Sequence, residues 1–217
     1  MTPITNEQQL EQRALELGLL PFFRSAVPGL SMEDMTPADH WFQEGSDGPW
    51  EWRMPVASRK RAVYGKFFHN KAGFISAALM PDFCNFRRDG YDFDTLFELG
   101  MAPERCRRIA LALEENGPMR TRDLKRASGL SGPSSGFDAA LNRLMMQGYV
   151  AVDGFEYALD KNGRPYGWGL ARYALLDQML GPEVTRARYT DDPATSLDRL
   201  ARAVPGFDPD QIRRLLV

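Results

Sequence analysis

The apolar and polar positions of the second half of the chain predict three consecutive helices. The first begins after Pro103, places apolar side chains at helical spacing and ends at Gly117. A short second helix is expected over residues 122–127, with Thr121 as its cap. The third begins at Phe137 and carries its apolar residues on one face.

Two strands are expected after the third helix, which Gly148 closes. Residues 149–152 combine aromatic and β-branched side chains, and residues 168–175 return as the second strand. The polar turn 160–165 joins the strands, and residues 166–169 are placed at the turn as well. Three helices followed by a β-ribbon are the arrangement of a winged helix, which is built to lay a helix into a DNA groove.

The first half of the chain has a less regular pattern. Asn6 caps a predicted first helix that ends before Gly18, and Ser31 either caps a short helix or lies in a loop. Residues 44–49 predict a turn, and residues 50–53 alternate as a strand would. Residues 62–68 fit a helix or a strand equally well.

The C-terminal tail predicts a pair of helices. Ser196 is expected to cap the first, over 197–204, and Pro209 starts the second, which ends at Leu216. The predicted fold is therefore α+β and mostly helical, with a winged helix in the C-terminal half. The N-terminal half is either a mixed, aromatic-rich region or a degenerate winged helix. The expected units are an N-terminal α+β region with its aromatic-rich block at 50–94, the winged helix and the helical pair, at 1–102, 103–181 and 182–217.

The composition is that of a globular protein. The 217 residues are 43% hydrophobic and 26% charged, enough to bury a sizeable core. No run of 18 apolar residues occurs, and charged residues interrupt positions 1–20, so we expect a cytoplasmic protein without a membrane partner. The two cysteines and two histidines lack the spacing of a zinc site, and neither a metal nor a cofactor is expected. These residues are Cys84, Cys106, His40 and His69.

The net charge of −2 argues against a DNA-binding surface that covers the whole molecule. Residues 103–181 contain eleven Lys and Arg against nine Asp and Glu, whereas residues 1–102 contain ten against fourteen. Contact with duplex DNA would therefore be local. The candidate contacts are polar or basic residues of the second helix, the third helix and the wing: Arg120, Arg122, Lys125, Arg126, Ser134, Ser135, Asn142, Arg143, Lys161 and Arg164.

Residues 50–94 form an aromatic-rich block with interleaved basic residues. Such a mixture suits stacking on bases beside phosphate contacts, but it also suits an ordinary core. The acidic residues at 82, 89, 92 and 94 could pair with Arg87 and Arg88. The aromatic residues are Trp50, Trp52, Tyr64, Phe67, Phe68, Phe74, Phe83, Phe86, Tyr91 and Phe93. The possible groove residues are Lys66, Lys71, Arg87 and Arg88, and His69 is the natural titrating group.

Several stretches point to a known family. The chain contains YGKFFHNKAGFIS at 64–76, MPDF at 80–83, RR at 87–88 and YAL at 173–175. Together with the winged-helix pattern, they resemble the winged-helix DNA glycosylases of the AlkZ type. The run 83–94 and the sequence PYGWG at 165–169 resemble more specifically the AlkZ-related bacterial proteins, and this likeness spans about residues 15–180.

The resemblance also shows where this chain departs from the glycosylases. Their Gln-x-Gln or Gln-x-Asp motif, which positions water and stabilises the cationic sugar, is absent here. Only Glu33 and Asp34 stand in the corresponding stretch, and Asn70 takes the place of a histidine when Ala72 is matched. Glu33, Asp34 and His69 are the weak catalytic candidates. The resemblance implies a catalytically diverged nucleic-acid-binding protein with a role in DNA repair or regulation. An active DNA glycosylase on a flipped, modified base and a protein-interaction module are the alternatives.

Overall fold

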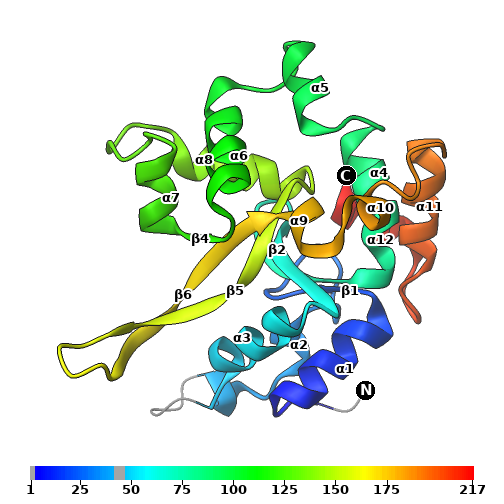
Figure 1. The fold of residues 1–217 in the computed structure, drawn as a ribbon. Helices are drawn as coiled ribbons and strands as arrows, with labels where there is room; N and C mark the ends of the chain where they lie inside the picture. The colour runs from blue at the N-terminus through cyan, green and yellow to red at the C-terminus, as the bar shows by residue number, and fades with distance from the viewer. Residues whose placement is uncertain (1–2, 42–46) are drawn as a thin grey trace.

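A six-stranded antiparallel sheet runs through the molecule and connects its two halves (Figure 1). The computed structural model describes residues 3–41 and 47–217. The strand order is β1-β3-β2-β5-β6-β4, and the halves meet where Tyr64 of β2 pairs with Val152 of β5. The strands are β1 (Leu19–Pro21), β2 (Ala62–Phe68), β3 (Lys71–Ser76), β4 (Met119–Arg120), β5 (Val150–Leu159) and β6 (Pro165–Leu175).

The described residues of the first half form five helices, of which the first and third pack against its strands, whereas the fifth packs against Glu104–Asn116, the first helix of the second half. Asn6 caps α1 by accepting a hydrogen bond from the Gln9 amide at 2.9 Å, as predicted. Of the two alternatives for Ser31, the structure shows the cap of a short helix. The elements are α1 (Glu7–Leu17), α2 (Met32–Met35), α3 (Pro49–Arg59), α4 (Met80–Arg88) and α5 (Phe93–Glu98), with 3-10 turns η1 (Ala38–Trp41) and η2 (Ala77–Leu79).

One prediction for this half is wrong. Residues 50–53 form the start of α3, because Pro49 occupies the first helical position and Trp52 and Val56 are buried on the same side. The ambiguous residues 62–68 form strand β2. Residues 44–46 of the predicted turn lie outside the described residues.

Three helices and a β-ribbon form the second half, close to the predicted bounds. They are α6 (Glu104–Asn116), α7 (Thr121–Ala127) and α8 (Phe137–Met146), and β5 and β6 extend as a two-stranded ribbon beyond the body (Figure 1). Thr121 begins α7, and Arg120 holds the cap position. Residues 166–169 were expected at the turn but lie within β6, because the turn closes with the Gly163 amide donating to the Asp160 carbonyl.

The C-terminal helices belong to the body of the fold, where the second and third pack against α4 and the fourth packs against the third and against β2. Their order is α9 (Leu176–Leu180), α10 (Pro182–Thr185), α11 (Pro193–Arg202) and α12 (Pro209–Leu216). Proline starts α12 as predicted. Ser196 does not cap α11, since Asp192 does; Ser196 is fully buried and donates a hydrogen bond to Asp82 at 2.9 Å.

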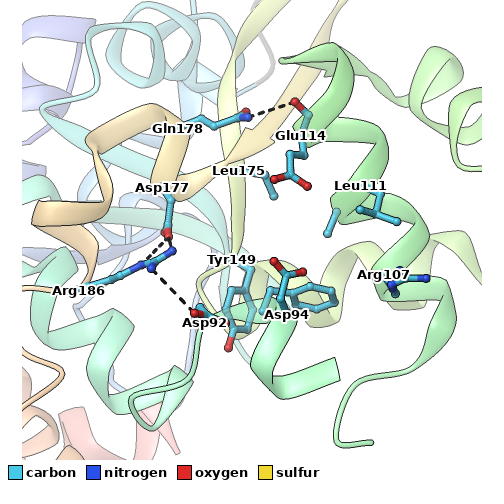
Figure 2. Close-up of a pocket in the computed structure, with 12 residues that line it drawn as sticks. Asp92, Asp94, Arg107, Leu111, Glu114, Tyr149, Leu175, Asp177, Gln178 and Arg186 are labelled. Carbon is cyan, nitrogen blue, oxygen red and sulfur yellow. Dashed lines mark hydrogen bonds and ion pairs between the residues drawn. The ribbon is translucent and has the colours of Figure 1, made fainter. Parts of the chain in front are cut away.

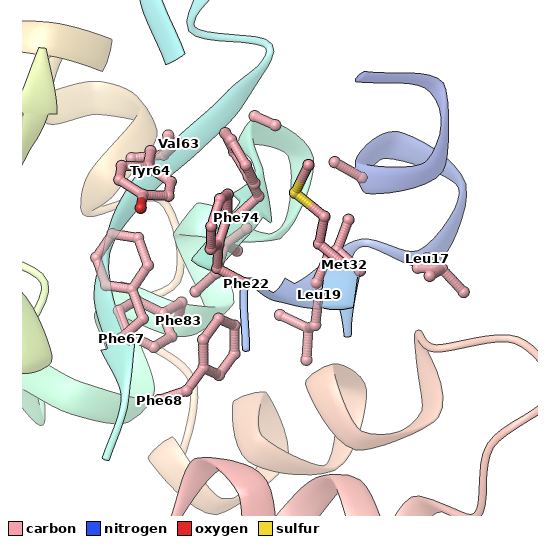
Figure 3. Packing of buried hydrophobic residues seen from close by; sticks show 14 of the residues in the cluster. Leu17, Leu19, Phe22, Met32, Val63, Tyr64, Phe67, Phe68, Phe74 and Phe83 are labelled. Atoms are coloured by element: carbon pink, nitrogen blue, oxygen red, sulfur yellow. The ribbon is translucent and has the colours of Figure 1, made fainter. Parts of the chain in front are cut away.

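Two hydrophobic clusters make up the core. The first joins the sheet of the N-terminal half to α11 and α12, and it contains Phe67, Phe68, Phe74 and Phe83, each at most 1% exposed (Figure 3). The second lies among α6, α7 and α8. Most of the aromatic-rich block is therefore core. No helix of the described residues has the length and apolar character needed to cross a membrane.

Candidate nucleic-acid interface

Four predicted cations lie together in an open groove between α7 and the ribbon. The groove has a volume of about 770 Å³ and contains no carboxylate among its described lining residues. Leu124 turns into the core, which leaves the remaining face of this short helix to its charged residues. The groove is lined by Arg120, Arg122, Lys125 and Arg126, with Thr121, Ser131, Ala158, Leu170 and Ala171.

The four cations differ in their counter-ions. Asp123 lies 3.2 Å from Arg120 and 3.4 Å from Arg126, and Asp138 lies 3.4 Å from Lys125. Arg122 is exposed, and no described carboxylate lies within ion-pair distance of it. A phosphate would therefore meet Arg122 without displacing an ion pair.

The ribbon adds exposed aromatic and apolar side chains beside this groove. Tyr166, Trp168 and Leu170 alternate along β6 and are 58%, 71% and 44% exposed. Leu170 lines the groove itself, and Tyr166 pairs with Ala158, which also lines it. These three residues were not among the candidates, although their alternation in the sequence could have identified them.

The remaining candidates lie in the turn of the ribbon and in the loop before α8. Lys161 and Arg164 are exposed in the turn of the ribbon, where Asp160 accepts hydrogen bonds from the amides of Asn162 and Arg164 at 2.8 Å. Ser134 and Ser135 precede α8, and the Ser135 hydroxyl accepts a hydrogen bond from the Phe137 amide. Phosphate contacts by Lys161 and Arg164 would extend the interface along the ribbon.

Asn142 and Arg143 of α8 lie elsewhere. They line a second cavity of about 600 Å³ with Asn70 of the β2–β3 turn and Arg87 of α4. Helix α8 thus presents its polar face to the first half of the molecule. The structure brings these two predicted contacts together with one predicted groove residue, Arg87, and separates them from the cations of α7.

The other proposed groove residues are engaged by the fold. Lys71 Nζ donates to the Arg24 carbonyl oxygen at 3.0 Å, whereas Lys66 is half-buried on β2. The Arg88 side chain is completely buried and lies 2.7 Å from Asp177, so an external phosphate cannot reach it. Asp177 is thus the partner of Arg88, not one of the four nearer acidic residues proposed from the sequence.

The Arg88 guanidinium lowers the pKa of the Asp177 carboxyl. Burial alone would raise the pKa of Asp177, but the Arg88 guanidinium, with hydrogen bonds from Arg88, Thr185 and Arg186, holds it below its usual value. Arg88 also donates to the Gly148 carbonyl oxygen at 2.5 Å. The pair therefore ties α4 to α9 and to the residue that ends α8.

The weak catalytic candidates all have structural partners. Asp34 accepts hydrogen bonds from Arg24 Nε at 2.9 Å and from the Ser31 hydroxyl at 2.8 Å. Glu33 accepts from the Arg24 amide at 2.9 Å. His69 occupies the tight turn between β2 and β3, and its Nε2 lies 3.1 Å from the Arg214 carbonyl oxygen.

A third hollow, between α5, α6 and α9, is acidic (Figure 2). Its volume is about 370 Å³, and Asp92, Asp94, Glu114 and Asp177 outnumber Arg107 and Arg186. Such a charge balance disfavours a phosphate. Among the described residues, no group of three or more His, Cys, Asp or Glu is arranged to hold a metal ion.

Comparison with known proteins gives one match. A family model described as AlkZ related matches residues 4–216, nearly the whole chain. Neither the curated proteins nor the solved structures contain a significant match. The chain therefore belongs to the AlkZ-related family.

Proposed function

We propose that this protein binds duplex DNA and that residues 104–175 act as a winged helix. The order α6, β4, α7, α8, β5, β6, with β4 paired to β6, supports the winged-helix assignment. Family membership supports a role in DNA repair or regulation, because it relates the chain to AlkZ-type DNA repair proteins. The observation on which the proposal depends is the groove where α7 places four cations beside exposed aromatic residues of the ribbon.

The proposed contact uses both parts of this surface. The α7 cations bind backbone phosphates, with Arg122 contributing most because no described carboxylate neutralises it. Tyr166 and Trp168 extend from the ribbon toward the bases of a groove. Since the whole chain has a net charge of −2, attraction to DNA is confined to this surface and falls steeply with salt.

The same proposal includes loss of glycosylase chemistry. Asp34 and Glu33 line a hollow of about 550 Å³, but a carboxylate that stabilises a cationic sugar has to be free to face it, and both are bound by Arg24. Asp34 also accepts hydrogen bonds from Ser31 and the Gly29 amide. These contacts give Asp34 a role in holding the loop before α2, which supports catalytic divergence.

The test is binding of the purified full-length protein to a labelled 20-base-pair duplex across a salt series. We expect measurable affinity at low ionic strength and a linear decrease in the logarithm of affinity with the logarithm of salt concentration. Arg122→Ala should weaken binding to all sequences alike and lower the magnitude of the salt slope by about 1.

Arg202→Ala is the matched control, because Arg202 is exposed on α11, across the molecule from α7 (Figure 1). It should leave both affinity and salt slope unchanged. Wild-type protein that shows no salt-dependent binding at low ionic strength would disprove the proposal. Equal losses of affinity in the two arginine variants would instead show that binding depends on the total charge of the protein and not on Arg122.

A further inference from the structure

The cavity beside α8, here called the α8 pocket, has an unusual lining. Three carboxamides and two guanidinium groups face a volume of about 600 Å³, and no described carboxylate lines it. Such a volume is in the range of small-molecule sites. The lining residues are Asn70, Asn142, Gln147, Arg87 and Arg143, with Ala139 and Met146 as apolar surface.

Arg87 is a half-buried cation without a described counter-ion, and its guanidinium lies 4.9 Å from the centre of the Phe86 ring. No described carboxylate lies within ion-pair distance, and Arg87 Nη2 donates to the Leu216 carbonyl oxygen. Burial lowers the pKa of Arg87, and its buried Nε has no hydrogen-bond partner among the described atoms. Because a buried charge without a counter-ion is costly, an anion bound here would offset that cost.

Arg143 adds a second guanidinium to the same pocket. It is exposed, donates to the Met101 carbonyl oxygen at 3.2 Å and likewise has no described carboxylate within ion-pair distance. Guanidinium groups present paired donors that match the oxygens of a phosphate. Two of them in one pocket suit an oxyanion such as a phosphate.

The carboxamides indicate what the phosphate is attached to. The Gln147 side-chain oxygen is buried without a described hydrogen-bond partner. Asn142 and Asn70 face the same space, from α8 and from a turn in which Asn70 has a φ of 64°. A carboxamide can donate and accept together at the edge of a nucleobase, most favourably adenine.

We propose that the α8 pocket binds one nucleotide, with its phosphate on Arg87 and Arg143 and its base edge on Asn142 and Gln147. Its residues are distinct from those of the α7 groove, so this inference goes beyond duplex binding and can fail or succeed separately. Two sources share this chemistry: a free mononucleotide, and an unpaired nucleotide of a DNA strand.

The test uses the full chain and calorimetric titration with dAMP and with inorganic phosphate. We expect dAMP to bind at least about 10-fold more tightly than phosphate, because a bidentate contact to a base contributes roughly that much discrimination. Asn142→Ala should reduce dAMP affinity about 10-fold and leave phosphate affinity unchanged. Arg87→Gln should weaken both ligands. Gln8→Ala, which removes an exposed carboxamide from α1, should weaken neither.

A second arm compares a duplex carrying one unpaired adenine with the fully paired duplex. Preference for the unpaired site that disappears in Asn142→Ala would identify a strand as the source, and dAMP binding alone would identify the free nucleotide. Phosphate binding equal to dAMP binding, or binding of neither dAMP nor the unpaired site, would overturn the proposal. Thermal melting checks that each variant is folded. Arg122→Ala should weaken duplex binding and leave dAMP titration unchanged, so the two proposals are tested independently.

Discussion

Residues 50–94 and the surface formed by α7 and the ribbon contain the same kinds of side chain, aromatic rings beside cations, but place them differently. In the first region Phe67, Phe74 and Phe83 are at most 1% exposed. On the ribbon, Tyr166 and Trp168 are more than half exposed. A buried ring contributes to the free energy of folding, whereas an exposed ring is available to a ligand.

The basic side chains of the two regions also differ in burial and in whether they have a counter-ion. Arg88 of the first region is buried and paired with Asp177, whereas Arg122 of α7 is exposed without a described carboxylate beside it. Arg87 departs from this rule, because it is half-buried yet unpaired among the described residues. Density of aromatic and basic residues along a sequence therefore does not locate a binding surface; burial and counter-ions do.

The largest expected effect is on stability, in the aromatic-rich region. Phe67 is fully buried, with its ring centre 5.2 Å from that of Phe83. Phe67→Ala should lower the free energy of unfolding by about 3 to 5 kcal/mol, because it removes buried apolar area and leaves a cavity. Urea denaturation followed by circular dichroism measures this change.

Tyr166→Ala is the matched aromatic control on the ribbon. It should change the free energy of unfolding by less than about 0.5 kcal/mol, as expected for an exposed side chain. Similar losses in both variants would break the comparison, because they would show that the ribbon aromatics also hold the fold together.

Much of the fold could be predicted where the determining interactions are local. Asn6 caps α1 through Gln9, and Gly117 and Gly148 follow α6 and α8 with φ values of 72° and 74°, which favour glycine. Proline at the start of α12 is another local feature. Each of these depends on residues a few positions apart, so the sequence alone contains the information.

The errors arose where distant residues decide the structure. Ser196 looked like a cap, but Asp82 and Asn85 of α4 hold it inside the core. Residues 166–169 are predicted at the turn, but Gly169 lies in β6, where a Cβ would lie 2.2 Å from Met54 Sδ of α3. This glycine allows close packing within a strand and is not required by a turn.

The same distinction between local and distant interactions decides how much of the candidate site could be predicted. The four cations of α7 could be grouped from the sequence because they lie on or beside one short helix. The separation of Asn142 from them could not, because it depends on the packing of α8 against β2. Nor could the sequence show that Arg88 forms an ion pair with Asp177, because Asp177 lies on a different helix.

The second prediction concerns Arg88 itself. Arg88→Met should lower the free energy of unfolding by about 3 kcal/mol, because Asp177 then keeps a largely buried carboxylate without its main partner. Breaking a buried ion pair typically costs about 3 to 5 kcal/mol. We expect the lower end of that range because the Asp177 carboxylate keeps the Arg186 guanidinium 3.0 Å away. Chemical denaturation measures it, with Arg122→Gln as the matched cation from the α7 surface.

Arg122→Gln should leave stability within about 0.5 kcal/mol of wild type, because exposed substitutions of this kind remove little packing. An Arg88→Met protein as stable as wild type would show that the buried pair merely replaces an equally good apolar contact. Buried, paired cations and exposed, unpaired cations would then not differ in their contribution to the free energy of unfolding.

The third prediction moves from folding to binding. Trp168→Ala should weaken binding to DNA about 10-fold at constant salt, because stacking of one base on an aromatic ring contributes about 1 to 3 kcal/mol. The melting temperature should not change. Fluorescence anisotropy measures affinity, and Leu99→Ala removes a similarly exposed apolar side chain, 57% exposed, from outside the ribbon.

Leu99→Ala should bind DNA as the wild type does. Equal affinity of wild type and Trp168→Ala would separate the ribbon from the α7 groove and leave phosphate contacts as the whole interface. Loss of melting temperature in Trp168→Ala would instead assign Trp168 to the fold.

The smallest expected effect is the pH dependence of the Arg88 contribution. Arg88 holds the pKa of Asp177 below its usual value against the opposing effect of burial. A carboxyl whose pKa is lowered in the folded state stabilises that state at pH values above the unfolded pKa, about 3.9. This contribution is lost as the pH falls through the folded pKa.

The difference in unfolding free energy between wild type and Arg88→Met should therefore be constant from pH 7 to 5. Between pH 5 and 3 it should shrink, whereas the difference for Arg122→Gln should stay near zero. Urea titrations at each pH measure both differences, and a difference for Arg88→Met that stays constant down to pH 3 would mean that Arg88 acts through packing alone.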